Sequence, residues 1–241
     1  MSENNARNEV EPRAELIDFT EEAAKNVATA ARLCYASEGA ENLRKNMTEE
    51  EKNKMIKKVL KLGHYSTLEH SFFSFHIICS RVTSHQLVRQ RIGVAYSQRS
   101  QRYVDEGEFS YITPPVIKDS SSSAEEKFHE HYAETRELYK DMRKEGIPAE
   151  DARFVLPAVK TNLIASYNAR SLYHLFKLRC CQRAQWEIRS LAEQMRQQVK
   201  SEFPVLFSRA GPKCETNGVC PEGEMSCGRV EILSEGGEQS G

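Results

Sequence analysis

The spacing of apolar residues along the chain predicts both helices and strands. Apolar residues recur every three or four positions, the period of an amphipathic helix, in four long segments. These segments are 20–34, 48–62, 123–145 and 184–202. Shorter helical patterns cover 83–91, 148–156 and 169–181. Apolar and polar residues instead alternate over 73–79 and 159–167, as they do in a half-buried strand.

The two ends of the chain lack this periodicity. Residues 1–14 are polar, and we expect them to be disordered. Residues 211–241 carry three of the seven cysteines, and we expect them to form a flexible tail. The periodic segments all lie between these ends, so residues 15–210 are expected to form the folded domain.

Composition indicates a protein with a buried core and no membrane span. Hydrophobic residues make up 39% of the 241 residues, and no apolar stretch approaches the ~20 residues that cross a bilayer. The N-terminal stretch MSENNARNEVEPR has no apolar signal core, so we expect no secretion. The number of cysteines is odd, and adjacent Cys180 and Cys181 are poor candidates for pairing with each other. A reducing compartment fits these thiols best, and we expect a cytoplasmic protein.

Charge is unevenly distributed along the chain. Asp and Glu make up 35 of the 241 residues, but neither occurs over 70–104 or over 152–186. The first of these windows holds five arginines, and the second holds six lysines and arginines. A guanidinium presents a planar fork of donors that matches two oxygens of a phosphate or a carboxylate. We therefore interpret the windows as two halves of one cationic site, with arginines kept free of acidic partners for an anion from outside the chain.

Other interpretations of these charges stay open at this point. An arginine-rich run is often a solvated basic face. The stretch SQRSQRY at 97–103 would suit an RNA-binding module that contacts phosphates and stacks on bases, and a nucleotide-binding regulatory protein without catalysis is a third possibility. The formal net charge of −1 means that positive charge is concentrated rather than spread, which favours a pocket for a small anion.

The sequence offers two weak patterns for a metal site. His64 and His70 are six residues apart and would not share a helical face. Cys214, Cys220 and Cys227 do not follow the CxxC spacing of common zinc modules, and three ligands are one short of a closed site. We expect no bound metal, with the three cysteines as free or weakly interacting thiols.

The first arginine window resembles the signature of the flavin-dependent thymidylate synthases. That signature is Arg-His-Arg, a spacer of seven or eight residues, then Ser, usually followed closely by Arg-Tyr. Here RQR at 89–91 is followed by eight residues and then SQRY at 100–103. Further segments resemble the family in the same order: GHYSTLEH at 63–70, SRVTSHQLVRQR at 80–91, ARFVLP at 152–157 and NARSLYHLFKLR at 168–179. Gln90 stands where the family usually has His, and the effect of that change is open.

The resemblance implies an activity, a cofactor, a fold and an assembly. The implied enzyme is a methyltransferase that makes dTMP from dUMP in de novo dTMP biosynthesis. It takes the one-carbon unit from 5,10-methylenetetrahydrofolate and the hydride from NADPH through bound FAD. We expect an α+β fold, a mainly antiparallel β-sheet flanked by helices, with 15–210 as a single catalytic domain. A homotetramer with active sites shared between chains is implied, and no nucleic-acid or membrane partner is expected.

The resemblance also implies which residues form the site. Contacts to dUMP are expected from Gln86, Leu87, Val88, Arg89, Gln98, Arg99, Ser100, Gln101, Arg102, Arg153 and Arg179. Contacts to FAD are expected from Ser66, Arg89, Gln90, Arg91, Gln98, Asn168, Ala169, Arg170 and His174. The family assigns the catalytic role to the position of Arg179, where a permanent cation near N3 and O4 of uracil stabilises the enolate-like charge that develops on the ring.

A protein nucleophile is not required by this chemistry. Cys180 and Cys181 lie beside Arg179, but we interpret them as small buried thiols. No His–acid pair is visible that would activate Ser100. His174, between Leu172 and Phe176, would by pattern alone be a core histidine, and only the resemblance places it at the flavin.

Overall fold

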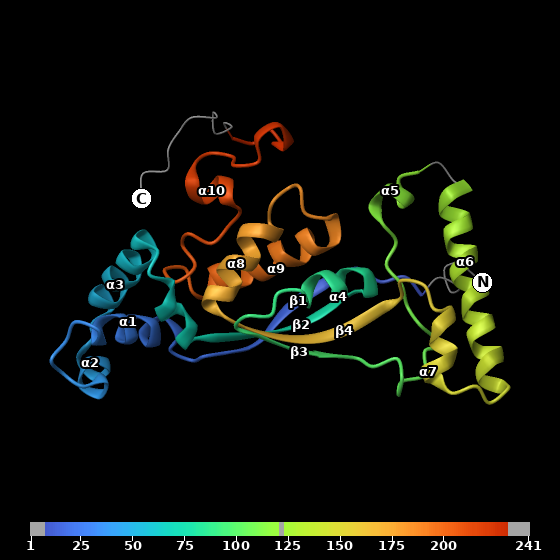
Figure 1. Cartoon of the computed structure of the whole chain (residues 1–241), viewed down its shortest axis with the longest axis horizontal. Helices are drawn as coiled ribbons and strands as arrows, with labels where there is room; N and C mark the ends of the chain where they lie inside the picture. Colours follow the sequence, from blue (N-terminus) through green and yellow to red (C-terminus); the bar gives the residue numbers. More distant parts are fainter. Residues whose placement is uncertain (1–7, 121–122, 231–241) are drawn as a thin grey trace. The chain divides into compact units, whose positions relative to one another are not determined.

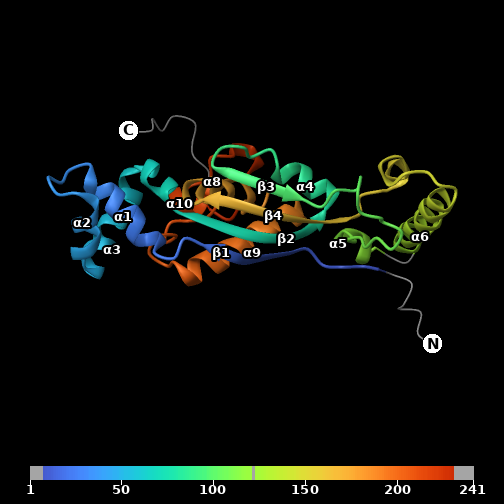
Figure 2. The same ribbon diagram turned by 90° about the horizontal axis from the view of Figure 1, so that it is seen from below.

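The computed structural model describes residues 8–120 and 123–230, which have an α+β architecture (Figure 1). Within these residues four strands form one sheet in the order β1-β2-β4-β3, and Figure 2 shows this order across the sheet. The strands are β1 (Arg13–Phe19), β2 (Phe72–Ser80), β3 (Val94–Gln98) and β4 (Lys160–Asn168). The longer helices are α1 (Ala23–Leu33), α2 (Ala40–Asn46), α3 (Glu49–Leu62), α4 (Arg81–Leu87), α6 (Ser123–Lys144), α8 (Ala169–Arg179) and α9 (Trp186–Glu202). The shorter elements are α5 (Pro115–Lys118), α7 (Ala149–Ala152), α10 (Lys213–Asn217) and the 3-10 turns Tyr65–His70, Arg153–Val155 and Gly223–Met225.

Backbone hydrogen bonds show that neighbouring strands run antiparallel. The N–H of Thr20, just after β1, donates to the carbonyl of Phe72, the first residue of β2, at 2.9 Å. The end of β1 therefore meets the start of β2. The other strand pairs follow the same rule, with bonds from Ala169 to Ser71, from Arg81 to Val159, from Asn168 to Gly93 and from Arg99 to Asn162. The predicted α+β fold with an antiparallel sheet is confirmed.

The chain divides into two compact units. Unit 1 comprises Met1–Arg13, Ile77–Arg89 and Tyr96–Ile164. Unit 2 comprises Ala14–His76, Gln90–Ala95 and Ala165–Gly241. The single catalytic domain expected over 15–210 stays a prediction.

The core of unit 2 holds α8 in place against the sheet. Phe73 of β2 packs edge-on against Phe203 and Phe207, with ring centroids 5.1 and 5.2 Å apart. Tyr173 of α8 stacks on Phe207 at 5.7 Å and donates its hydroxyl to the carbonyl of Leu206. Burial of these aromatic rings gives α8 one fixed, apolar face. The opposite face of α8 is left exposed, and it carries two of the predicted site residues.

Helix α3 begins and ends as the sequence predicts. Thr48 and Glu51 form a capping box, in which the Thr48 hydroxyl accepts from the Glu51 N–H and the Glu51 carboxylate accepts from the Thr48 N–H. Gly63 ends the helix at φ 70°, a left-handed conformation that glycine adopts without strain. Ile56, Val59 and Leu60 form its buried stripe.

The core of unit 1 is an aromatic cluster formed by α6, the segment between β3 and α5, and the residue that precedes β4. Phe109, Tyr111, Tyr132 and Val159 are buried together. The rings of Tyr111 and Tyr132 lie 4.2 Å apart at their centroids. Burial raises the pKa of Tyr132 to about 12. Helix α6 therefore packs against the core of unit 1.

The N-terminal region differs from the prediction. Residues 1–7 of the predicted disordered segment lie outside the described residues, but residues 8–14 are not disordered. The Val10 N–H donates to the Tyr111 carbonyl, and β1 begins at Arg13. In β1 only Ala14 is buried, so this strand lacks the alternation that marks a half-buried strand. Its backbone is instead paired partly with side chains of α9, because Gln194 and Gln198 accept from the N–H groups of Ala14 and Leu16.

The arginine-bearing segment also differs in detail. The predicted helix over 83–91 is α4, which begins two residues earlier and ends at Leu87. The Ser80 hydroxyl caps it by accepting from the Thr83 N–H. Residues 94–98, which follow it, form β3. Over the described ranges, none of the helices combines the length and the apolar character needed to cross a bilayer.

Candidate active site

The end of α4 presents the first predicted dUMP residues. Gln86 and Val88 are half-buried, Leu87 is buried in the core, and Arg89 is exposed. Because α4 ends at Leu87, Arg89 lies beyond the helix and does not share a helical face with Gln86. The Arg89 side chain makes no ion pair within residues 8–120 and 123–230. This guanidinium is therefore available to an anionic ligand.

Gln98 is held at the end of β3 by two hydroxyl groups. Its side-chain nitrogen donates to the hydroxyl of Ser84 at 3.1 Å and to that of Thr161 at 3.2 Å. Ser84 and Thr161 are both buried. These bonds fix the amide of Gln98 between α4 and β4, so that only its carbonyl oxygen remains to accept from a ligand.

Arg99 and Arg102 have acidic partners, contrary to the expectation for this window. Arg99 lies 3.4 Å from the carboxylate of Glu106, which is 3% exposed. Burial raises the pKa of Glu106, and the positive charge of Arg99 opposes that rise. Arg102 pairs with Glu150 at 3.1 Å, and its backbone N–H donates to the Ser100 hydroxyl oxygen at 3.3 Å. Both acids lie outside the acid-free windows, so a run without Asp or Glu does not predict arginines without acidic partners.

Glu150 brings two predicted dUMP residues from the two windows together. Its carboxylate accepts from the Nε of Arg102, and its backbone carbonyl accepts from the Nε of Arg153 at 2.9 Å. Arg153 is half-buried and makes no ion pair within the described part of the chain. Gln101, which precedes Arg102, is also half-buried. Glu150 could not be predicted from the sequence, because nothing in its local pattern marks it as a partner of either arginine.

In unit 2 the segment after Arg89 is clamped onto the N-terminus of α8. The Gln90 side chain donates to the Ser171 carbonyl at 2.7 Å, and the Ser171 hydroxyl donates to the Ile92 carbonyl at 2.6 Å. Asn168 caps α8 by accepting from the Ser171 N–H at 2.8 Å. Gly93 has a φ of 67°, and a Cβ there would lie 2.3 Å from the Asn168 side chain. Residues of the two acid-free windows, 70–104 and 152–186, are therefore in contact at the N-terminus of α8.

This clamp changes the expected roles of three predicted FAD residues. Asn168 and Ala169 are buried, and the Asn168 side-chain oxygen already serves as a helix cap. The amide of Gln90, in the position where His is usual, has one hydrogen atom committed to Ser171. Arg91 beside it is exposed and has no ion pair among the described residues. We interpret Gln90 and Asn168 as residues that shape this segment, with Arg91 as the group free to reach a ligand.

The exposed face of α8 lines a cavity of about 270 Å³. Arg170 and His174, one turn apart, lie in its wall together with Tyr65, Lys177 and Arg209. Arg170 forms an ion pair with Glu69. His174 is exposed, so the alternative interpretation of His174 as a core histidine is wrong. Ser66, the remaining predicted FAD residue, is exposed and lines a different cavity together with His64.

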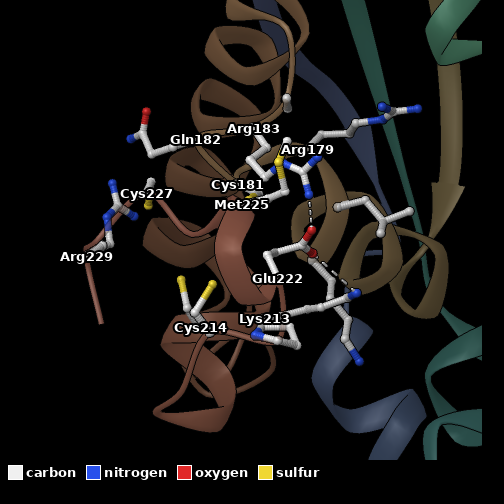
Figure 3. Close-up of a pocket in the computed structure, with 15 residues that line it drawn as sticks. Arg179, Cys181, Gln182, Arg183, Lys213, Cys214, Glu222, Met225, Cys227 and Arg229 are labelled. Carbon is white, nitrogen blue, oxygen red and sulfur yellow. Dashed lines mark hydrogen bonds and ion pairs between the residues drawn. The ribbon is translucent and has the colours of Figure 1, made fainter. Parts of the chain in front are cut away.

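Arg179, the predicted catalytic residue, is the last residue of α8. It is half-buried and lines a second cavity, of about 260 Å³, together with residues 181–184 and the cysteine-bearing tail (Figure 3). It makes no ion pair within 8–120 and 123–230. Cys180 beside it is 1% exposed, and burial raises the pKa of its thiol far above the ordinary range. A buried, protonated thiol is a poor nucleophile, so Cys180 fits the structural role predicted for it.

Comparison with known proteins gives a consistent result. The family described as thymidylate synthase complementing protein (Thy1) matches residues 15–205. The flavin-dependent thymidylate synthase of Geobacter sulfurreducens is 47% identical over 220 residues, which cover 89% of this chain and 93% of that protein. The enzyme of the same name from Clostridium tetani is 43% identical over 237 residues, with 90% and 94% covered.

One solved structure supports the fold. The crystal structure of a UMP/dUMP methylase from Streptomyces cacaoi, bound with 5-Br dUMP, matches with a TM-score of 0.73. The match covers 84% of this chain and 97% of that one, at 24% sequence identity. At this level of identity the likeness concerns the fold alone.

Proposed function

The chain belongs to the thymidylate synthase complementing protein family, and we propose that its arginines at 89, 102 and 153 bind dUMP while α8 binds the flavin. It is a flavin-dependent thymidylate synthase, a methyltransferase that makes dTMP from dUMP in de novo dTMP biosynthesis. FAD is its cofactor, and NADPH and 5,10-methylenetetrahydrofolate are its co-substrates. The family match over residues 15–205 is the observation that carries this assignment.

Arg102 and Arg153 are proposed to hold the phosphate of dUMP. Glu150 orients both guanidiniums through its carboxylate and its carbonyl. Each arginine keeps further N–H groups that can donate to phosphate oxygens, since a guanidinium has five. A nucleoside monophosphate carries about two negative charges near neutral pH, and charge-assisted hydrogen bonds to arginine are among the strongest in proteins. Gln86, Gln98, Ser100 and Gln101 add neutral hydrogen bonds in the same unit.

The cavity on α8 is proposed to hold part of FAD. Arg170, Lys177 and Arg209 give its wall a positive charge that fits the pyrophosphate of a dinucleotide, and Tyr65 and Tyr173 offer aromatic surface. Bound FAD supplies the redox chemistry of the reaction. The residues of the chain bind and orient it, and Arg91 and His174 are the proposed polar contacts beyond the cavity's arginines.

Arg179 is proposed to act on the pyrimidine. Attack by the uracil ring on a one-carbon electrophile places enolate-like charge on the ring, and a fixed cation lowers the energy of that state. A guanidinium stays charged at any working pH, so this stabilisation needs no proton transfer. The lack of an acidic partner among the described residues leaves its charge undiminished.

The assembly is proposed to be a homotetramer with shared active sites. Three large apolar side chains next to predicted site arginines are almost fully exposed: Ile92 at 88%, Phe154 at 83% and Tyr103 at 79%. Apolar side chains this exposed are available for contact with a second chain or with a ligand. Ile17 and Phe72, on neighbouring strands of unit 2, are also about half exposed. A second copy of the chain that covers these residues would complete the surroundings of the arginines, and light scattering on the purified protein would show the tetramer mass.

The function is tested directly on purified protein. It should be yellow, release FAD on denaturation, and form dTMP only when dUMP, methylenetetrahydrofolate and NADPH are all present. An RNA-binding module or a regulatory nucleotide-binding protein would be colourless and inactive in this assay. A flavin-free preparation that still makes dTMP would remove the assignment.

Arg153→Ala should weaken dUMP binding by about tenfold to a hundredfold, because a hydrogen bond to a charged group contributes about 1.5–3 kcal/mol. Isothermal titration of the FAD-loaded protein with dUMP measures the change. Arg143→Ala is the matched control, since this unit 1 arginine pairs with Asp105 and is not a predicted site residue. Equal dUMP affinity in Arg153→Ala and the wild type would show that Arg153 is misplaced.

A further inference from the structure

The cavity beside Arg179 gathers thiols from two distant parts of the chain. Its wall contains Cys181, from the connection between α8 and α9, and three cysteines of the tail: Cys214, Cys220 and Cys227. Figure 3 shows Cys181, Cys214 and Cys227 around this space. All four are free thiols. Cys181 is remote from the three tail cysteines along the chain, and its only cysteine neighbour in sequence is Cys180, so no local spacing groups it with the tail.

The tail has very little else with which to build a core. Among residues 213–230 the only buried side chains are those of Cys214 and Cys220. The tail also forms ion pairs at its surface. Glu222 pairs with Arg183 and Lys213, and Glu215 pairs with Arg196 and Arg229. Ion pairs exposed to solvent contribute roughly 0–1 kcal/mol each. A segment whose buried side chains are thiols is typical of small structures that are held by a metal or by a disulfide.

The charge around the cavity fits a cluster of thiolates. Its wall carries Lys177, Arg179, Arg183, Lys213 and Arg229, against one acid, Glu222. A zinc ion with four thiolates has a net charge of −2, which these cations offset. Gly218 lies between Cys214 and Cys220, and Gly223 lies between Cys220 and Cys227. Their φ values of 77° and 54° allow the chain to turn between successive cysteines.

We propose that Cys181, Cys214, Cys220 and Cys227 bind one Zn²⁺ ion. Four thiols lose their protons to solvent, and four zinc–sulfur bonds form in a closed tetrahedral site. Within the described residues no three His, Cys, Asp or Glu side chains yet converge on a metal position. Binding therefore includes a closing movement of the tail cysteines toward Cys181. The ion ties the tail to the residues that directly follow Arg179, and this inference is independent of the reaction that the enzyme catalyses.

Metal content of the intact FAD-bound protein tests the proposal. The protein is produced in zinc-supplemented medium, dialysed without chelator and analysed by plasma mass spectrometry. We expect one zinc per chain, and at least a fivefold lower content in Cys220→Ser and Cys227→Ser. Cys227 is exposed, so Cys227→Ser should fold even if Cys220→Ser does not. Cys34→Ser is the matched control with full zinc content, since Cys34 is an exposed thiol outside this cavity.

A second readout identifies the ligands. Protein grown with Co²⁺ in place of zinc should show the thiolate charge-transfer bands and the long-wavelength bands of tetrahedral cobalt, and the latter lie beyond the flavin absorption. These bands should be lost in Cys227→Ser and kept in Cys34→Ser. A metal-free protein would overturn the proposal, and so would iron with sulfide in place of zinc. A mass lower by two hydrogens, which marks a disulfide, would also overturn it. Equal zinc content in Cys227→Ser and Cys34→Ser would show that Cys227 is not a ligand and would overturn the four-cysteine site.

Discussion

Arg179→Ala should lower the rate of dTMP formation by about a hundredfold to a thousandfold while FAD stays bound. Removing one group that stabilises developing negative charge in a transition state typically costs about 2.7–4 kcal/mol. The loss should appear in kcat as well as in dUMP affinity, because the charge on the ring is larger in the transition state than in the ground state. Steady-state rates at saturating dUMP, with the flavin absorbance of each preparation as the measure of bound FAD, separate these effects.

Two further variants make this result specific. Arg179→Lys keeps a cation but loses the planar fork, so we expect an intermediate rate. Arg32→Ala removes an arginine that pairs with Glu51 on the surface of unit 2, and it should keep the wild-type rate within about twofold. Wild-type turnover by Arg179→Ala would remove Arg179 from the catalytic role. Loss of FAD together with activity would instead assign it to flavin binding.

Strong periodicity in the sequence was enough to predict most of the fold. The capping box at Thr48 and the glycine at 63 fixed both ends of α3, and alternation placed β2 and β4 within one or two residues. Strand β1 was missed because it lacks the alternation of buried and exposed residues, and part of its backbone is bonded to the distant side chains of Gln194 and Gln198. A contact across 180 residues leaves no mark in a local pattern.

The candidate site was predicted only in part, for a related reason. The absence of acids along a window is a local property, whereas the partners of Arg99, Arg102 and Arg170 are Glu106, Glu150 and Glu69, all outside the windows. The expectation that the two windows come together did anticipate real contacts inside each unit. Arg102 and Arg153 meet at Glu150, and Gln90 meets Ser171. The specific mediators, a carboxylate and a backbone carbonyl, follow from the tertiary structure alone.

Gly93→Ala should be the most destabilising single-methyl change in the site region. The residue has a φ of 67°, where an alanine costs about 1–2 kcal/mol. The new Cβ would also lie 2.3 Å from the Asn168 side-chain nitrogen and 2.5 Å from the Ser171 hydroxyl. Displacing Asn168 from its cap on α8 costs about 1 kcal/mol more. We expect a total of about 3 kcal/mol, or a Tm roughly 6–12 °C lower, measured by thermal unfolding.

Gly63→Ala separates the two causes of this loss. Gly63 has nearly the same φ, 70°, but nothing lies within 4 Å of a Cβ built there. Its substitution should therefore show the backbone strain alone, about 1–2 kcal/mol and a Tm lower by a few degrees. If both variants shift the Tm equally, the contact between Gly93 and the α8 cap carries no energy. If Gly93→Ala also releases FAD at a temperature where it is folded, this contact positions the flavin-binding face of α8 as well as stabilising the helix.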